Sequence, residues 1–573
     1  MKKITLKHCL IAATALSFLC SGCSQLPEPQ HKKNSVENRS QARTKSGKQS
    51  LEATIQNSEA LALKGLNSMP DANSSMMYAL PEPSPAQYIH DQVPFPPYPE
   101  LQRESYNALE ESPFINTAND PLSTFSIDVD TASYANVRRF LNDGRLPPPG
   151  AIRIEEMINY FTYNYLKPKN NKPIAITTEL GPCPWQPKHK LVRIGLQAKD
   201  IDTTKLPPSN LVFLIDVSGS MNHANKLPLL KKSMLMLVDQ LTARDRISIV
   251  VYAGADYVVL EPTAGDKTTT IKKAINSLNS GGSTHASSGI TTAYKLARQV
   301  FMPGGNNRII LASDGDFNVG ITSRDQLEKL IAKERESGIY LTVLGFGMGN
   351  YHDDTMEILA DKGNGNYSYI DSLLEAKKVL VKERIRTLFT LARDVKLQIE
   401  FNPAKVGAYR LLGYENRVLA DEDFNNDKKD AGEIGVGHTV TALYELMPTD
   451  DKTLPSVDPL KYQSTTHTSE NSAEILTIKL RYKPLKSKKS SLIDQPVIDR
   501  NVALKQTSND FRFAASVAGF GMMLKKSKYT ADFTYDQLIS LAKKAKGTDG
   551  DGYRAECIRL METAQLLVDS EKK

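Results

Sequence analysis

The chain has 573 residues, and its 72 Lys and Arg against 65 Asp and Glu give a formal net charge of +7. This length allows more than one domain. The charge is too mild for a chain of this size to indicate nucleic-acid binding, and the sequence has no aromatic and basic stripe of the kind that single-strand binders use. It also has no Cys/His cluster with zinc spacing and no phosphate-binding loop that ends in Gly-Lys-Ser/Thr.

The N-terminus has the features of a secretion signal. Lysines precede an apolar stretch, residues 9–20, that is too short to span a bilayer. The following Cys20-Ser21-Gly22-Cys23 resembles a bacterial lipobox, although Cys20 stands where Leu is usual. We expect residues 1–22 to be a signal peptide and Cys23 to carry a lipid anchor in the cell envelope, with an ordinary cleaved signal as the alternative. Ser24 favours the outer membrane over the inner membrane.

Residues 23–115 are predicted to be a disordered linker behind this lipid anchor. The stretch is rich in Pro, Ser, Gln and Asn and has few apolar runs. It cannot bury enough apolar surface to offset the entropy of ordering the chain. A flexible segment of this length has a root-mean-square reach of roughly 50 Å, so the folded part can sample positions well away from the membrane.

Residues 116–205 are predicted to form an N-terminal flanking segment of mixed helices and strands. Ser123–Asp130 alternates with a period of two, which predicts a strand. Thr131 is a candidate N-cap for a helix that runs to about Leu141. A second helix is expected at 152–161, and strands at 174–181 and 190–199.

The most informative stretch is Asp216-Val217-Ser218-Gly219-Ser220, which directly follows the apolar run 211–215. Thr284 lies in a later loop, and Asp314 follows a second apolar strand, 308–313. In an open α/β sheet, ligands collect at the carboxyl ends of the strands. Hard oxygen donors in this number suit Mg²⁺, with Mn²⁺ or Ca²⁺ as alternatives. The predicted metal ligands are Asp216, Ser218, Ser220, Thr284 and Asp314.

Strands and helices alternate through residues 206–375, which predicts an α/β domain with a doubly wound, mostly parallel sheet. A short antiparallel edge strand is expected at 257–260. The other predicted strands are 211–216, 246–252, 307–313, 339–346 and 367–371. The predicted helices are 226–241, 267–278, 287–302, 325–337 and 354–361.

The five predicted metal ligands resemble the metal-ion-dependent adhesion site (MIDAS) of von Willebrand factor type A (VWA) domains, and all five positions match. The resemblance implies that a Glu or Asp of a protein partner completes the metal shell. Because one metal–carboxylate contact cannot give specificity, the rim must supply it. The candidate rim residues are Met221, Asn222, His223, His285, Phe317 and Asn318.

The segments 121–134, 153–161 and 430–445 resemble the YfbK-like family of bacterial VWA lipoproteins. That resemblance implies the architecture but no activity. Strands expected at 394–402, 407–415, 436–446 and 474–483 form a C-terminal β-rich domain, 376–497. Together with the flanking segment they predict a β-sandwich into which the VWA domain is inserted. Helices at 502–525, 534–546 and 552–570 form the C-terminal region, 498–573.

Two other features have simple interpretations. Cys183 and Cys557 remain in the mature chain, and two unpaired buried thiols are favoured over a disulfide. The acidic turn 421–427 lacks the Gly and Glu that an EF-hand requires at its sixth and twelfth places.

The function predicted from the sequence is non-enzymatic, Mg²⁺-dependent binding of an envelope or extracellular protein. The first alternative is a structural or assembly scaffold, in which the acidic turn 421–427 supplies the carboxylate internally. The second alternative is a hydrolase with Ser218 or Ser220 as nucleophile and His285 as base. The hydrolase is disfavoured because the sequence has neither a Gly-x-Ser-x-Gly elbow nor an evident third triad member.

Overall fold

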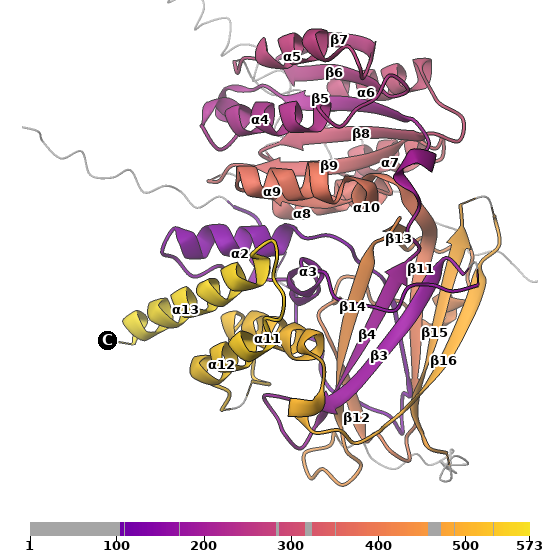
Figure 1. Cartoon of the computed structure of the whole chain (residues 1–573), viewed down its shortest axis with the longest axis vertical. Helices are drawn as coiled ribbons and strands as arrows, with labels where there is room; N and C mark the ends of the chain where they lie inside the picture. The colour runs from indigo at the N-terminus through magenta and orange to yellow at the C-terminus, as the bar shows by residue number, and fades with distance from the viewer. Residues whose placement is uncertain are drawn as a thin grey trace, which may run out of the picture. The chain divides into compact units, whose positions relative to one another are not determined.

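The computed structural model of the protein describes residues 104–572, with gaps at 108, 171, 282–285, 316–323, 350, 456–471, 486 and 531. The described residues belong to a unit that spans Pro96–Lys573. The predicted signal peptide, Cys23 and the linker up to residue 103 lie outside the described residues. Figure 1 shows an α/β domain, a pair of facing sheets and a group of helices.

Six strands form the sheet of the α/β domain, in the order β10-β9-β8-β5-β6-β7 (Figure 1). Neighbouring strands run parallel except β6 and β7, which run antiparallel. This arrangement confirms the predicted doubly wound sheet with an antiparallel edge strand. The strands are β5 (Ser209–Asp216), β6 (Arg246–Ala253), β7 (Ala255–Ala264), β8 (Asn306–Ser313), β9 (Tyr340–Phe346) and β10 (Tyr367–Ile370).

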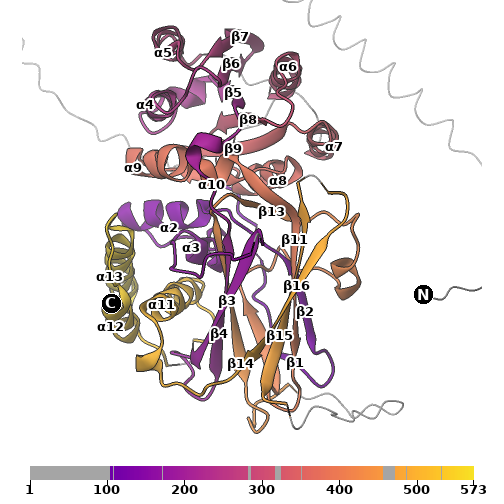
Figure 2. The ribbon, with the colours of Figure 1, turned by 45° about the vertical axis from the view of Figure 1, so that its right-hand side comes forward.

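Helices cover both faces of this sheet, because its inner strands are apolar on both sides. All residues of β5 are buried, and successive side chains point to opposite faces. Phe213 packs on the side of α4 and α5, whereas Leu214 packs on the side of α6, α7 and α8 (Figure 2). The helices are α4 (Leu227–Val238), α5 (Thr268–Asn276), α6 (Ala286–Gln299), α7 (Arg324–Arg335), α8 (Asp353–Lys362) and α9 (Leu373–Lys377).

Two further sheets face each other as a β-sandwich (Figure 2). One has the order β1-β12-β14-β4-β3, and the other has the order β13-β11-β15-β16, with β2 also paired to β11. Inward side chains such as Val192 on β4 and Leu397 on β11 share one core. The strands are β1 (Ile115–Asn116), β2 (Leu122–Ser126), β3 (Ile174–Pro182), β4 (Lys190–Ala198), β11 (Thr390–Phe401), β12 (Ala408–Leu412), β13 (Gly432–Gly435), β14 (Thr439–Met447), β15 (Glu474–Pro484) and β16 (Ser491–Ile498).

The α/β domain is inserted into this sandwich, as the order of predicted elements indicated. The chain leaves β4 in one sheet and builds the α/β domain. It then returns through a π-helix, Lys378–Lys382, and α10 (Arg384–Leu388) into β11 of the other sheet. The two connections of the α/β domain therefore run to different sheets of the sandwich.

A layer of helices covers the outer face of the sheet that contains β4 (Figure 2). Leu191 and Leu443 of this sheet pack in one cluster with the helices. Gly195 lets the ring of Tyr165 lie on the sheet, because a Cβ there would sit 2.2 Å from the ring. None of the described helices combines the length and apolar character that crossing a bilayer requires. The helices of the layer are α2 (Ala132–Asn142), α3 (Ile154–Asn159), α11 (Asn509–Leu524), α12 (Tyr535–Ala545) and α13 (Tyr553–Glu571).

The prediction of a disordered linker was wrong for residues 104–107 and 109–115. Glu104 pairs with Arg139 at 2.8 Å, and Glu111 pairs with Arg410 at 2.9 Å. Both arginines are almost fully buried. The carboxylates therefore anchor a stretch whose composition alone predicts disorder.

Three local predictions also differ from the structure. Thr131 precedes α2 but makes no side-chain capping bond. The helix predicted at 502–525 begins only at Asn509, because Ser508 caps it by accepting a backbone N–H. The strand predicted from residue 436 begins at Thr439, because Gly437, at a φ of +69°, forms a turn before it.

Cys183 and Cys557 are free and buried, as predicted. Burial raises the pKa of both thiols and so keeps them protonated. We expect neither thiol to react with iodoacetamide in the folded full chain at mildly alkaline pH, and both to react in denaturant without reductant. Peptide mapping by mass spectrometry checks this, and a disulfide-linked pair of these two peptides would contradict it.

Candidate metal centre

Asp216 is the last residue of β5, and the turn that follows holds its carboxylate in place. Its Oδ1 atom accepts a hydrogen bond from the backbone N–H of Ser218 at 2.9 Å, and its Oδ2 atom accepts one from the hydroxyl of Ser313 at 3.1 Å. The hydroxyl oxygens of Ser218 and Ser220 lie 2.9 Å apart. The turn therefore presents one carboxylate and two hydroxyl oxygens close together.

Asp314 brings a second carboxylate to the same edge of the sheet. It directly follows β8, which pairs in parallel with β5. Asp216 and Asp314 are 0% and 3% exposed. Burial, and to a smaller extent the negative charge of Asp314, raises the pKa of Asp216 to about 6. The two side chains thus form a buried acidic pair at the carboxyl ends of neighbouring strands.

The donors at this edge fit a small, hard divalent cation. Mg²⁺ prefers oxygen ligands and near-octahedral geometry, and this site offers two carboxylates and two hydroxyls. A dication would also relieve the repulsion that acts between Asp216 and Asp314. Thr284, the fifth predicted ligand, lies outside the described residues.

One residue of the site was not predicted. The Nζ atom of Lys226 donates a hydrogen bond to Oδ2 of Asp314 at 2.8 Å, and both side chains are buried. Lys226 immediately precedes α4, and no spacing rule for metal motifs includes a lysine at this distance from Asp216. Its neighbour Gly347 starts the loop after β9, and Met348 in that loop is 45% exposed. Met348 is therefore a further rim candidate.

The predicted rim is described only in part. Asn222 and His223 are exposed at the turn beyond the candidate ligands Ser218 and Ser220, and their role in a rim stays a prediction. The prediction was wrong for Met221, which is 0% exposed because its apolar side chain turns into the core beneath α4. The other predicted rim residues lie outside the described residues: His285, Phe317 and Asn318.

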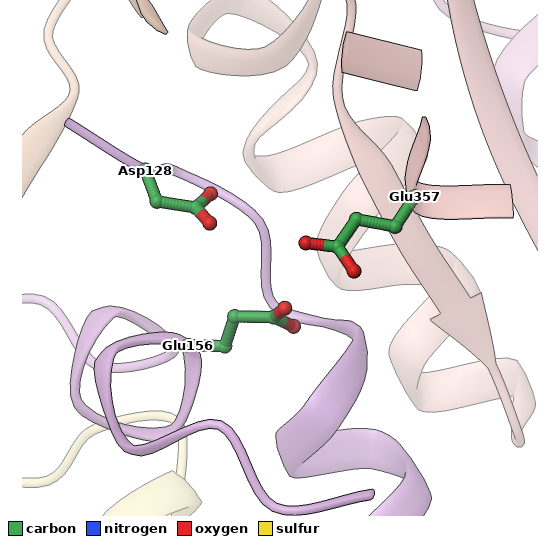
Figure 3. A group of neighbouring side chains, drawn as sticks. All are labelled: Asp128, Glu156 and Glu357. Carbon is green, nitrogen blue, oxygen red and sulfur yellow. The ribbon is translucent and has the colours of Figure 1, made fainter. Parts of the chain in front are cut away.

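A second group of carboxylates lies where α3 meets the α/β domain. Asp128, Glu156 and Glu357 point toward one another, with oxygens within 4.8 Å of one another (Figure 3). They come from the segment after β2, from α3 and from α8, and all three are buried. This group could not be predicted from the sequence, because its members are far apart in the chain and belong to no motif.

Two buried arginines pair with this group, and together they form what we term the arginine cluster. Burial raises the pKa of Glu357 to about 7 and that of Glu156 above its usual range; Arg153 opposes both shifts, and Arg417 also opposes that of Glu357. Guanidinium groups already bind these carboxylates. We therefore infer that the arginine cluster holds the domains together and does not bind a metal ion. Arg153 contacts Glu156 (2.9 Å), Glu357 (2.8 Å) and Asp353; Arg417 contacts Asp128 (3.0 Å), Glu357 (3.6 Å), Asp130 (3.7 Å) and Asp361.

The acidic turn 421–427 has its own partners on the sandwich. The hydroxyl of Thr124 donates to Asp421 at 2.5 Å, and Arg481 pairs with Asp427 at 3.0 Å. The turn begins with a short 3-10 helix, Asp421–Phe424, rather than a calcium loop. These carboxylates are thus engaged by the sandwich in this structure.

Comparison with known protein families divides the chain in the same way as the fold. The model for the von Willebrand factor type A domain matches residues 210–382. A model described as the C-terminal part of the uncharacterized protein YfbK matches 386–567, and one described as von Willebrand factor matches 100–193.

Individual proteins resemble the chain over different lengths. The uncharacterized protein YfbK of Escherichia coli is 46% identical over 473 residues, which cover 81% of each chain. The uncharacterized protein sll0103 of Synechocystis is 31% identical over 188 residues, or 32% of this chain and 43% of that protein. A solved structure of a von Willebrand factor type A protein from Catenulispora acidiphila covers 67% of this chain and 89% of its own, at 14% identity and a TM-score of 0.37.

The arginine cluster is expected to contribute to the stability of the fold. Arg153→Met is expected to lower the free energy of unfolding by about 3–5 kcal/mol, because it leaves buried carboxylates unpaired. Arg145→Met serves as the control, since Arg145 is 41% exposed and 3.4 Å from Asp143. Arg145→Met is expected to lower the free energy of unfolding by less than about 1 kcal/mol. Denaturant unfolding of the full chain measures both, and equal effects would disprove the assignment.

Proposed function

Because the chain belongs to the YfbK-like family of proteins with a von Willebrand factor type A domain, we propose that it binds a protein partner through a divalent metal ion at the carboxyl edge of its α/β sheet. The observation that carries this proposal is the meeting of Asp216, Ser218, Ser220 and Asp314 at the ends of two neighbouring strands. In this proposal the protein is a binding module and not an enzyme.

Each residue of the site has a defined task in this proposal. Asp216 would supply a negatively charged oxygen ligand, and the backbone N–H of Ser218 and the hydroxyl of Ser313 hold its carboxylate in place. Ser218 and Ser220 add neutral oxygens, and Asp314 adds the second negative charge. Mg²⁺ when bound supplies a coordination position that a Glu or Asp of the partner fills. Among the described residues, Asp216 and Asp314 are the carboxylates that oppose its charge, so attraction for a further carboxylate remains.

Specificity is assigned to the exposed side chains around the metal. Asn222 and His223 lie on the turn that carries Ser220, and Met348 extends from the loop after β9. A carboxylate alone is found on every protein surface, so these polar and apolar contacts must select the partner. We propose an envelope or extracellular protein as that partner.

The proposed location is the cell envelope. The lipobox-like Cys20-Ser21-Gly22-Cys23 supports lipid attachment at Cys23, and Ser24 favours the outer membrane. A polar segment follows and ends near Glu104, where the described residues begin. Such a tether lets the binding edge meet partners that are not at the membrane surface.

Calorimetric titration of the full chain with MgCl₂ tests the metal site. Wild type should give a saturable signal, and Asp216→Ala should give none, because it removes the carboxylate that both Ser218 and Ser313 orient. Asp239→Ala is the matched control, since Asp239 is 57% exposed and pairs with Lys272 at the surface. It should bind like wild type. Absence of Mg²⁺ binding to wild type would refute the proposal.

The affinity for Mg²⁺ should depend on pH. The pKa of Asp216 is raised to about 6, so the carboxylate is ionised above this pH and protonated below it. Protons therefore compete with the metal, and the affinity should fall by up to about tenfold for each pH unit below about 6 and level off above it. Titrations across this range measure the change. A constant affinity between mildly acidic and neutral pH would contradict this prediction, because no ligand would then titrate near pH 6.

A further inference from the structure

Lys226 places a positive charge inside the metal centre. It is the residue before α4, and its Nζ atom lies 2.8 Å from Oδ2 of Asp314. The side chains of Lys226 and Asp314 are 8% and 4% exposed. A buried ion pair of this kind is costly to break, because each partner would lose a buried counter-ion.

The loop after β9 holds the side chain of Lys226 in one position. Gly347 has a φ of +82°, and a Cβ at this position would lie 2.1 Å from Cε of Lys226. The carbonyl of Gly347 accepts a hydrogen bond from the hydroxyl of Tyr369, and the N–H of Gly349 donates to Glu104 at 2.8 Å. The loop along the aliphatic chain of Lys226 is thus held from two sides, so the ammonium is directed at Asp314.

The charge of the site changes when this lysine is included. Asp216 and Asp314 carry two negative charges when ionised, and Lys226 offsets one of them. From these three described side chains, an incoming dication meets a net charge of about −1, and it also meets the ammonium of Lys226 on the oxygen of Asp314. It must bind beside this ammonium or displace it.

We propose that Lys226 is a resident cation that competes with the divalent metal for Asp314 and thereby lowers the metal affinity of the site. This inference rests on the proposed function. The lysine keeps Asp314 paired when no metal is bound, so the metal-free site stays folded. Metal binding then becomes a reversible exchange of one cation for another instead of a requirement for folding.

The test compares Mg²⁺ binding by the full-length wild type, Lys226→Met and Lys226→Gln. Both substitutions remove the competing charge, and the glutamine amide can still donate to Asp314. Each should bind Mg²⁺ about tenfold more tightly than wild type, or better. Lys231→Met is the matched control on α4, since its ammonium binds the carbonyls of Asn276 and Leu278. Its affinity should stay within about twofold of wild type.

Thermal unfolding gives a second readout that does not depend on a partner. In EDTA, Lys226→Met should melt below wild type, because Asp314 loses its buried counter-ion. Added MgCl₂ should raise the melting temperature of this variant by more than it raises that of wild type.

The outcomes separate this inference from the proposed function. Equal or weaker Mg²⁺ affinity in both Lys226 variants, beside a wild type that binds, would overturn the inference alone. Binding by the variants and none by wild type would overturn both the reversible exchange and the proposed function, because the lysine would then block the site in the natural chain. Absence of binding in all proteins would overturn both the inference and the metal site.

Discussion

The arginine cluster is the interaction on which the arrangement of the folded parts depends. Arg153 enters from the helical flank and Arg417 from the sandwich, and both bind Glu357 on α8 of the α/β domain. Removing these charges from water costs free energy, and this cost is offset only while each charge is paired with its partners. The cluster therefore specifies one relative placement of these three parts, because any other placement leaves charges buried and unpaired.

The same flank also reaches the candidate metal ligands. Lys226 pairs with Asp314 and packs along Gly347, and two residues later in that loop Gly349 donates a hydrogen bond to Glu104. Glu104 in turn pairs with Arg139 on α2. Ionic, packing and hydrogen-bonded contacts along the loop after β9 thus link the candidate metal ligands to the helical flank.

Much of this structure could be predicted from local sequence patterns, whereas the contacts between segments that are distant in the chain could not. The motif from Asp216 to Ser220 follows an apolar strand within a few residues, so its place at the sheet edge follows from spacing alone. Arg153 and Lys226 bind residues far away in the chain, and nothing beside them in the sequence signals this. The edge strand β16 was not predicted, because every second residue is exposed and Pro496 lacks a backbone N–H to donate to a neighbouring strand.

The insertion of the α/β domain between β4 and β11 has a mechanical consequence. β4 lies between β14 and β3, and β11 lies between β13 and β15, so neither connecting strand is at an edge. A force on the α/β domain passes through these two connections into both sheets at once. Each connecting strand is hydrogen-bonded on both sides, so two ladders of hydrogen bonds must break to detach it, whereas an edge strand has one.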